Sequence, residues 1–227
     1  MAQKQKPETI LTPHQKEVLD RVSSEDYFAS RYYLAGGTAL AEFYLKHRLS
    51  EDLDFFTEKQ EVNFPLVAKF FENKAGVLKI KKIETKKVFG LYSLFITFTD
   101  NEKLKVDFNY YPFPRINKGL RYKKLAIEDI YDIGVDKVHT VVMKPRARDF
   151  IDIYFTIREE RYDFEKLILD AKAKFDWDIS AIELGARFSE AAKSSDFPRM
   201  LKKIDHAEWK NFFVDEARKL KSKIFKK

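Results

Sequence analysis

Cysteine is absent from the 227-residue chain, which excludes disulfide bonds, thiolate metal sites and cysteine nucleophiles. Long hydrophobic runs are absent as well, because no uninterrupted apolar stretch is long enough to span a bilayer. The segment 1–20 contains no apolar core of signal-peptide length. From these absences we expect a cytoplasmic protein without a membrane partner.

Disorder is also excluded, because hydrophobic residues make up 44% of the chain and include 21 Phe and 11 Tyr. The formal net charge of +7 is moderately basic. The basic residues gather in clusters at residues 78–87, 117–124, 144–148 and 218–227. Together such clusters could surround a polyanion such as RNA, whereas any one of them alone also fits a solvated surface.

The residue patterns divide the chain into two parts. A helix is indicated after Thr12, which is suited to be its N-cap, with Pro13 at the first helical position. Strand-like runs follow at residues 32–35, 52–56, 77–90, 91–100 and 103–111, and helical patterns at residues 38–48 and 64–76. From Ile127 onward the patterns have a helical period. We therefore predict an α+β domain over residues 1–115, including the N-terminal helix, and an α-helical domain over residues 116–227.

Two segments place acidic residues among large hydrophobic ones. In a strand, residues two apart share a face, so Asp52 and Asp54 project together while Leu53 and Phe55 point the other way. In "LKVDF" the same alternation sets Asp107 apart from its apolar neighbours. If the two strands are adjacent, three carboxylates converge and need compensating charge, which Mg²⁺ supplies. Two such ions can hold the attacking and leaving oxygens of an in-line displacement.

The chain has only seven glycines, yet Gly36 and Gly37 are adjacent, between a predicted strand and a predicted helix. Thr38 follows them and is well placed as the N-cap of that helix. A helix N-terminus offers unpaired N–H groups, and glycine lets a phosphate approach the backbone closely. A tight turn that needs a positive φ would explain the glycines structurally. Their proximity to the Asp-x-Asp favours the phosphate-binding interpretation.

The segment "YYLAGGTALAEFYLKHRLSEDLDFF" (residues 32–56) resembles the first motif of the AbiEii/AbiGii-type nucleotidyltransferase toxins, in the DNA polymerase β-like nucleotidyltransferase superfamily. "KVDF" (residues 105–108) is similar to the strand that bears the third carboxylate of that family. "DKVHTVVMKPRARDFIDIYF" (residues 136–155) resembles its helical motif, with a lysine followed by Arg-Asp-Phe-x-Asp-x-Tyr. The resemblance implies an α+β fold: a polymerase β-like domain with a mixed sheet flanked by helices, then a C-terminal helical domain.

The resemblance also implies roles for individual residues. The catalytic residues would be Asp52, Asp54, Asp107, Lys137 and Asp152. The acids among them that bind Mg²⁺ would be Asp52, Asp54 and Asp107, with Asp107 also helping to deprotonate the attacking hydroxyl. The nucleotide would be bound by Gly36, Gly37, Thr38, Arg48, Ser50 and Lys137, with Arg48 and Ser50 supporting the loop before the metal ligands.

The residues of the helical motif support this in part. On the helix expected from about Ile127, Lys137 interrupts an apolar i±4 row that includes Ile133 and Val141. A lysine in that position either reaches toward solvent or points into a site. The following helix carries a polar row made of Asp149, Asp152 and Thr156. Helix salt bridging, from Arg148 to Asp152 at i,i+4, would explain that row without a site.

The activity implied is Mg²⁺-dependent transfer of a nucleoside monophosphate from an NTP to an acceptor hydroxyl, with release of pyrophosphate. By the same resemblance the acceptor would be RNA, expected to be the 3′ end of tRNA. The protein would then be a growth-arresting toxin of an abortive-infection system, neutralised by a separately encoded antitoxin. Two alternatives stay open: the same chemistry on a protein or small-molecule acceptor, and a non-catalytic, metal-stabilised nucleic-acid-binding module.

Overall fold

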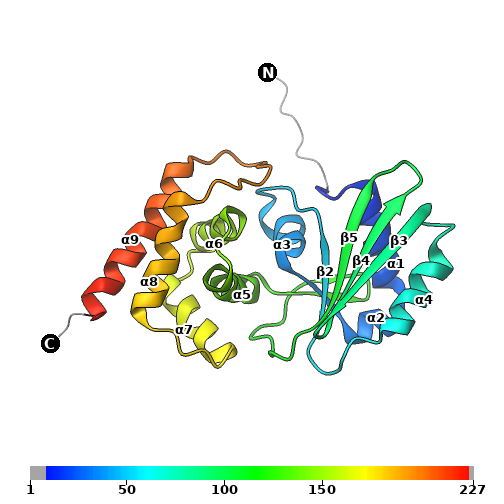
Figure 1. The fold of residues 1–227 in the computed structure, drawn as a ribbon, viewed down its shortest axis with the longest axis horizontal. Helices are drawn as coiled ribbons and strands as arrows, with labels where there is room; N and C mark the ends of the chain where they lie inside the picture. The colour runs from blue at the N-terminus through cyan, green and yellow to red at the C-terminus, as the bar shows by residue number, and fades with distance from the viewer. Residues whose placement is uncertain (1–8, 225–227) are drawn as a thin grey trace, which may run out of the picture. The chain divides into compact units, whose positions relative to one another are not determined.

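The computed structural model describes residues 9–224, the side chains from residue 221 onward excepted, so the end of the predicted basic cluster at residues 218–227 lies outside it. The chain forms two compact units (Figure 1). The first contains the described residues up to Pro114 together with Lys118–Glu128. The second contains Arg115–Asn117 and the chain from Asp129 onward. In the described part, no helix combines the length and the apolarity needed to cross a membrane.

The first unit is built on a mixed sheet of seven strands in the order β3-β4-β5-β2-β1-β7-β6. Its strands are β1 (Tyr33–Ala35), β2 (Leu53–Thr57), β3 (Ile80–Val88), β4 (Leu91–Phe98), β5 (Lys103–Tyr110), β6 (Arg121–Tyr122) and β7 (Leu125–Ile127). The pairs β2–β5 and β1–β7 are parallel, and the other neighbours are antiparallel. The five strand runs expected from the sequence are therefore all present, and β2 and β5 are neighbours.

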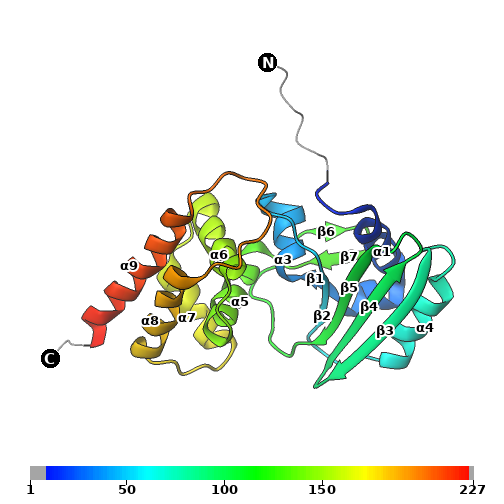
Figure 2. The same ribbon diagram turned by 45° about the horizontal axis from the view of Figure 1, so that its top comes forward.

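Three helices cover one face of this sheet: α1 (Pro13–Ser24), α2 (Asp26–Arg31) and α4 (Phe64–Lys74) (Figure 2). Aromatic residues form much of the contact. The Phe28 ring of α2 lies 4.7 Å from that of Phe70 on α4 and 5.5 Å from that of Phe108 on β5. The helix α1 begins as predicted, because Thr12 caps it and Pro13 is its first residue. Burial of these apolar side chains leaves the opposite face of β2 and β5 for polar ones.

Strands β6 and β7 differ from the expectation that the chain beyond residue 115 is helical. They form a short antiparallel hairpin, and β7 pairs in parallel with β1. Leu125 and Ile127 are fully buried there. Strands of two and three residues are too short to produce a periodic pattern, so their pairing with an existing strand, which the local sequence does not encode, determines them.

The second unit consists of the helices α5 (Ile130–Met143), α6 (Ala147–Glu160), α7 (Phe164–Lys174), α8 (Ala181–Ser189) and α9 (His206–Ile224), with a 3₁₀ turn at Glu190–Lys193. Its core is aromatic and includes Phe150, Phe164, Phe188, Trp209 and Phe213. The segment 115–117 joins this unit because the buried carboxylate of Asp132 accepts hydrogen bonds from the backbone N–H groups of Ile116 (2.7 Å) and Asn117 (2.8 Å).

Candidate active site

The acidic residues lie on adjacent strands. In the parallel pairing of β2 with β5, Asp54 is the direct partner of Asp107. Asp52 precedes Leu53, the first residue of β2, and shares the face of Asp54. Leu53 and Phe55 point into the core and are fully buried, as the alternation predicted. The geometric expectation of three carboxylates on one face of neighbouring strands is therefore met.

The diglycine turn lies against both the acids and the loop before them. Gly36 has a φ of +70°, and a Cβ there would lie 2.7 Å from Oδ2 of Asp54. A Cβ on Gly37 would collide with Nη2 of Arg48 and would lie 3.0 Å from Oγ of Ser50. The first position therefore favours glycine for its conformation, and a Cβ at either position would displace a side chain of the candidate site.

Thr38 has a different local role from the predicted one. The helix α3 (Gly36–Ala39) begins at Gly36, its N-cap is Ala35, and no side chain caps it. Thr38 is instead buried, and its hydroxyl donates a hydrogen bond to the main-chain oxygen of Asp52. The N-cap prediction was wrong because the chain turns into the helix two residues earlier than Thr38. The hydroxyl ties the turn to the start of β2.

The helix expected over residues 38–48 is interrupted. After α3 the chain continues as a π-helical segment, Leu40–Leu45, which ends where Lys46 adopts a left-handed conformation with φ of 48°. Such π-helical turns are rare and are often found at functional sites. Here the wider turn ends the helix before Arg48, so that the chain can enter the loop leading to β2.

Arg48 and Ser50 are held by the surrounding chain. Arg48 is buried, and its Nη1 donates to the main-chain oxygen of Leu49 at 2.9 Å. The main-chain oxygen of Ser50 accepts a hydrogen bond of 2.8 Å from Nε2 of Gln15, a buried residue of α1. These contacts fix the loop that delivers Asp52 to the sheet.

A lysine lies among the acids. Lys105 is two residues before Asp107 on β5, and its Nζ lies 2.5 Å from Oδ2 of Asp107. Partial burial disfavours the charged ammonium, but the hydrogen bond to Asp107 and the charges of Asp107, Asp52 and Asp54 outweigh it and raise the pKa of Lys105. The ammonium therefore stays protonated and offsets part of the negative charge of the acidic face.

The acids have the donor chemistry that Mg²⁺ prefers, since all three are carboxylates. Asp107 is 6% exposed, and its Oδ1 has no hydrogen-bond partner in the described part of the chain. Such an orphaned buried oxygen suits a cation ligand. Within residues 9–224, however, no three acidic or histidine side chains stand in a ready-made metal-binding arrangement. The residues therefore fit the ion chemically, and Lys105, bound to Oδ2 of Asp107, would compete with the ion for this carboxylate.

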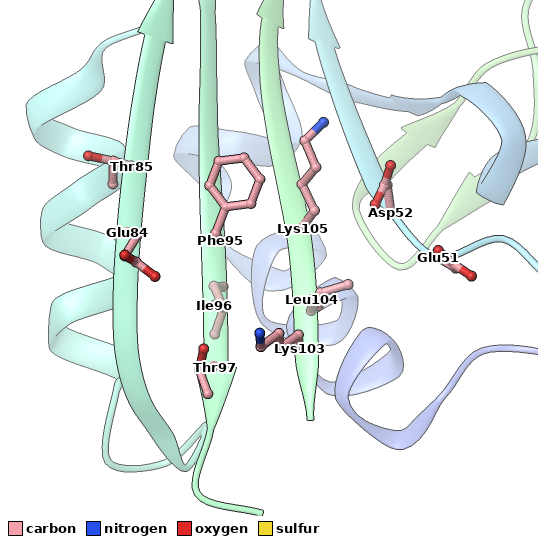
Figure 3. Close-up of a pocket in the computed structure, with 10 residues that line it drawn as sticks. All are labelled: Glu51, Asp52, Glu84, Thr85, Phe95, Ile96, Thr97, Lys103, Leu104 and Lys105. Atoms are coloured by element: carbon pink, nitrogen blue, oxygen red, sulfur yellow. The ribbon is translucent and has the colours of Figure 1, made fainter. Parts of the chain in front are cut away.

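An open groove of about 590 Å³ runs beside the acids on the same face of the sheet (Figure 3). It extends from Asp52 across β5 and β4 to β3. Figure 3 shows that Lys105 on β5 and Phe95 on β4 line this groove with their side chains. A volume of this size is within the range of ligand-binding clefts.

The lysine of the helical motif is engaged in an ion-pair network inside the second unit. Nζ of Lys137 on α5 lies 2.5 Å from Oδ1 of Asp149 and 2.9 Å from Oδ2 of Asp152, both fully buried on α6. Nε of Arg146 adds a contact of 2.8 Å to Asp149. The polar row is therefore buried, and it consists of Asp149, Asp152 and Thr156. Because a buried charge needs a close counter-charge, Lys137 on α5 compensates the two carboxylates.

Sequence reasoning missed two of these residues. Lys105 could have been found, because the alternation that places Asp107 on the acidic face places residue 105 there too. Asp149 was recognised only as part of a polar row, although its carboxylate lies closer to Nζ of Lys137 than that of Asp152 does. Its pairing depends on how α5 packs against α6, which the local pattern does not give.

Comparison with known proteins agrees with this geometry. Residues 17–222 match the family described as nucleotidyl transferase AbiEii toxin, type IV toxin–antitoxin system. The chain is 31% identical over 170 residues to an uncharacterised protein of Aquifex aeolicus, covering 73% of this chain and 76% of the relative.

Solved structures from Helicobacter pylori share the fold. A proposed nucleotidyltransferase superposes with a TM-score of 0.57 at 21% identity, covering 94% of this chain and 97% of that one. The protein JHP933 superposes with a TM-score of 0.54 at 21% identity, covering 92% and 91%. The expected α+β fold, a mixed sheet flanked by helices and followed by C-terminal helices, is thereby confirmed. From the family match over most of its length, the chain belongs to the AbiEii family of nucleotidyltransferase toxins of type IV toxin–antitoxin systems.

Proposed function

We propose that this nucleotidyltransferase carries out Mg²⁺-dependent transfer of a nucleoside monophosphate from an NTP to the 3′ end of tRNA. The observation that carries the proposal is the register of β2 with β5, which pairs Asp54 with Asp107 directly beside the turn at Gly36. Carboxylates and a close-approach glycine turn at one place are what a metal-bound triphosphate needs.

The residues divide into a metal-binding and a nucleotide-binding set. The metal-binding residues would be Asp52, Asp54 and Asp107, which together would hold two Mg²⁺ ions. When bound, the ions neutralise charge on the phosphates and on the attacking and leaving oxygens. The triphosphate would lie against the turn and its supporting loop, at Gly36, Gly37, Thr38, Arg48 and Ser50. The family resemblance also assigns two residues of the second unit, Lys137 and Asp152. The role that it implies for Lys137 is contact with the nucleotide phosphates.

The bond changes are simple. The acceptor hydroxyl oxygen bonds to the α-phosphorus, and the bond from that phosphorus to the α–β bridging oxygen breaks, so that pyrophosphate leaves. By the family resemblance, Asp107 would also help to remove the proton from the attacking hydroxyl. Most of the acceleration would come from positioning and charge compensation, as in phosphoryl transfer generally.

The family match implies an antitoxin as the natural partner of this toxin. The net charge of the chain supports an RNA acceptor, because a charge of +7 favours binding of a polyanion such as tRNA. We infer that this modification of tRNA causes the growth arrest expected of the toxin.

The test is a transfer assay with each of the four α-labelled NTPs, total RNA and Mg²⁺. Wild type should label a band of tRNA length, and Asp54→Asn should label none while it unfolds at a temperature close to that of wild type. Glu72→Gln on α4, an exposed acid on the covered side of the sheet, is the matched control and should behave as wild type. Label on protein alone would replace the tRNA proposal with a protein acceptor.

A further inference from the structure

The face of the sheet that carries the acids continues beyond them over β5, β4 and β3. Residues paired across antiparallel strands share a face. One such row is Glu84, Phe95 and Lys105, and the next is Lys82, Thr97 and Lys103. A third row, Lys86, Ser93 and Asp107, leads into the acidic site. The groove described above is the hollow of this surface, which we call the β3–β5 face.

Phe95 is exposed at the centre of the β3–β5 face. Its side chain is 41% exposed, whereas its neighbours Leu94 and Ile96, which point to the helix-covered side, are 1% exposed. Single exposed apolar residues are common on protein surfaces, so the informative feature of Phe95 is its place on the sheet, paired directly with Lys105 and beside the row of Lys103. A flat aromatic ring beside lysines, on a sheet surface, is the arrangement with which proteins stack single-stranded nucleic acid bases.

The charges on this face favour a polyanion. Lysines 82, 86 and 103 project from it, and so does Lys105, which is paired with Asp107. Two exposed acids outside the catalytic set line the groove: Glu51, and Glu84, which lies 3.0 Å from Lys82. That exposed ion pair adds little stability and opens easily. Ammonium groups spaced along neighbouring strands can each lie next to a phosphate of a bound chain.

We propose that the β3–β5 face binds the single-stranded 3′ segment of the RNA acceptor, with one base stacked on Phe95 and the backbone phosphates beside Lys103 and its neighbours. The orientation of the RNA in this inference rests on the proposed function, which requires that the 3′ end reaches the acids. The groove leads there, because Asp52 and Lys105 are among the residues that line it. It names single-stranded RNA rather than a duplex, since a base must be unstacked to lie on the ring. A protein acceptor would have no need of this combination of stacked ring and lysines.

The experiment measures RNA binding by full-length protein without NTP and in EDTA, so that it does not depend on catalysis. The probe is a fluorescein-labelled single-stranded oligoribonucleotide of about twelve nucleotides, a length such grooves can bind. We expect Phe95→Leu to weaken its affinity about ten-fold through loss of stacking, and Phe95→Trp to retain it. In the Phe95→Trp protein, quenching of tryptophan emission by the unlabelled oligonucleotide beyond that of wild type, which contains two Trp, would locate the base on the introduced ring.

Lys103→Ala should weaken binding and lower the slope of log affinity against log salt by about 0.7, the value for one phosphate contact to a single strand. The matched controls are Phe89→Leu, at an exposed turn, and Lys69→Ala, on the helix that covers the other face. Both should bind as wild type. All variants alter exposed side chains, and equal melting temperatures by circular dichroism verify their folding.

Two results would overturn the inference: equal affinities for wild type, Phe95→Leu and Lys103→Ala, or binding of the probe by none of them. Failure of the proposed function looks different. Absence of nucleotide transfer to any RNA, with the Phe95 and Lys103 effects on binding intact, would remove the transfer reaction and leave the RNA surface standing.

Discussion

The ammonium nitrogen of Lys105 lies 2.5 Å from Oδ2 of Asp107, so a cation of the protein itself contacts the third acid of the candidate site. Asp107 therefore has one oxygen engaged by lysine and one, Oδ1, without a hydrogen-bond partner in the part of the chain that the structure describes. The lysine and a divalent cation compete for the same carboxylate. This relationship leads to the first prediction.

Lys105→Met should bind Mn²⁺ or Mg²⁺ more tightly than wild type in the absence of nucleotide, by about ten-fold, since a hydrogen bond to a charged group contributes roughly 1.5–3 kcal/mol. Isothermal titration calorimetry measures this. Lys103→Met, on the same strand, is the control and should leave the metal affinity unchanged. Equal affinities for all three proteins would show that Lys105 does not compete with the ion.

Gly36→Ala should abolish nucleotide transfer. The added Cβ would lie 2.7 Å from Oδ2 of Asp54 and displace it, and the positive φ adds a conformational cost of about 1 kcal/mol. Gly90→Ala is a matched control, because Gly90 also has a positive φ, +75°, but lies at the turn between β3 and β4. Both variants should lose similar stability in urea titrations, and only Gly36→Ala should lose transfer. Full transfer by Gly36→Ala would contradict the site.

Asp20 should make stability depend on acid pH. Burial acts to raise the pKa of this α1 carboxyl, but hydrogen bonds from Lys123, Lys16 and Tyr122 outweigh it and lower the pKa to about 2. A depressed folded-state pKa contributes stability that is present above the unfolded value near 3.8 and is lost as pH falls toward about 2.

The corresponding variant is Asp20→Asn, measured by urea unfolding at several pH values. It should be less stable than wild type at neutral pH, and the difference should shrink below about pH 4. Glu17→Gln, on the same helix and 4.0 Å from Arg21, should show little difference at any pH. A stability gap for Asp20→Asn that persists unchanged at pH 2 would rule out this ion-pair cluster as its source.

Lys137→Met should destabilise the second unit by about 3 kcal/mol, because it leaves the buried carboxylates of Asp149 and Asp152 without their shared cation. Lys166→Met, which removes an exposed i,i+4 pair with Asp170, should cost far less. Thermal unfolding followed by circular dichroism compares the two.

The double variant Lys137→Met/Asp149→Asn separates structure from chemistry, because Asp149 is a buried partner of Lys137 that has no assigned catalytic role. Removing one of the two stranded charges should restore much of the stability, while transfer stays lost if Lys137 binds the nucleotide phosphates. Recovery of transfer together with stability would assign Lys137 a purely structural role.

Several features followed from the sequence because they are local. Alternation with a period of two places Asp52 and Asp54 on one face and Leu53 and Phe55 on the other, whatever the strand pairs with. Thr12 and Pro13 specify the start of α1 through capping alone. The adjacency of Gly36 and Gly37 indicated a tight strand-to-helix turn for the same reason.

Tertiary structure decided the rest, because each remaining feature joins residues distant in sequence. The pairing of Asp54 with Asp107 depends on β5 inserting between β4 and β2, and the ion pairs of Lys137 depend on α5 packing on α6. The hairpin of β6 and β7 exists only because β1 offers it an edge. The sequence thus determined which side chains share a face or a turn, and long-range packing determined which faces meet, since backbone periodicity carries no information about the neighbouring strand or helix.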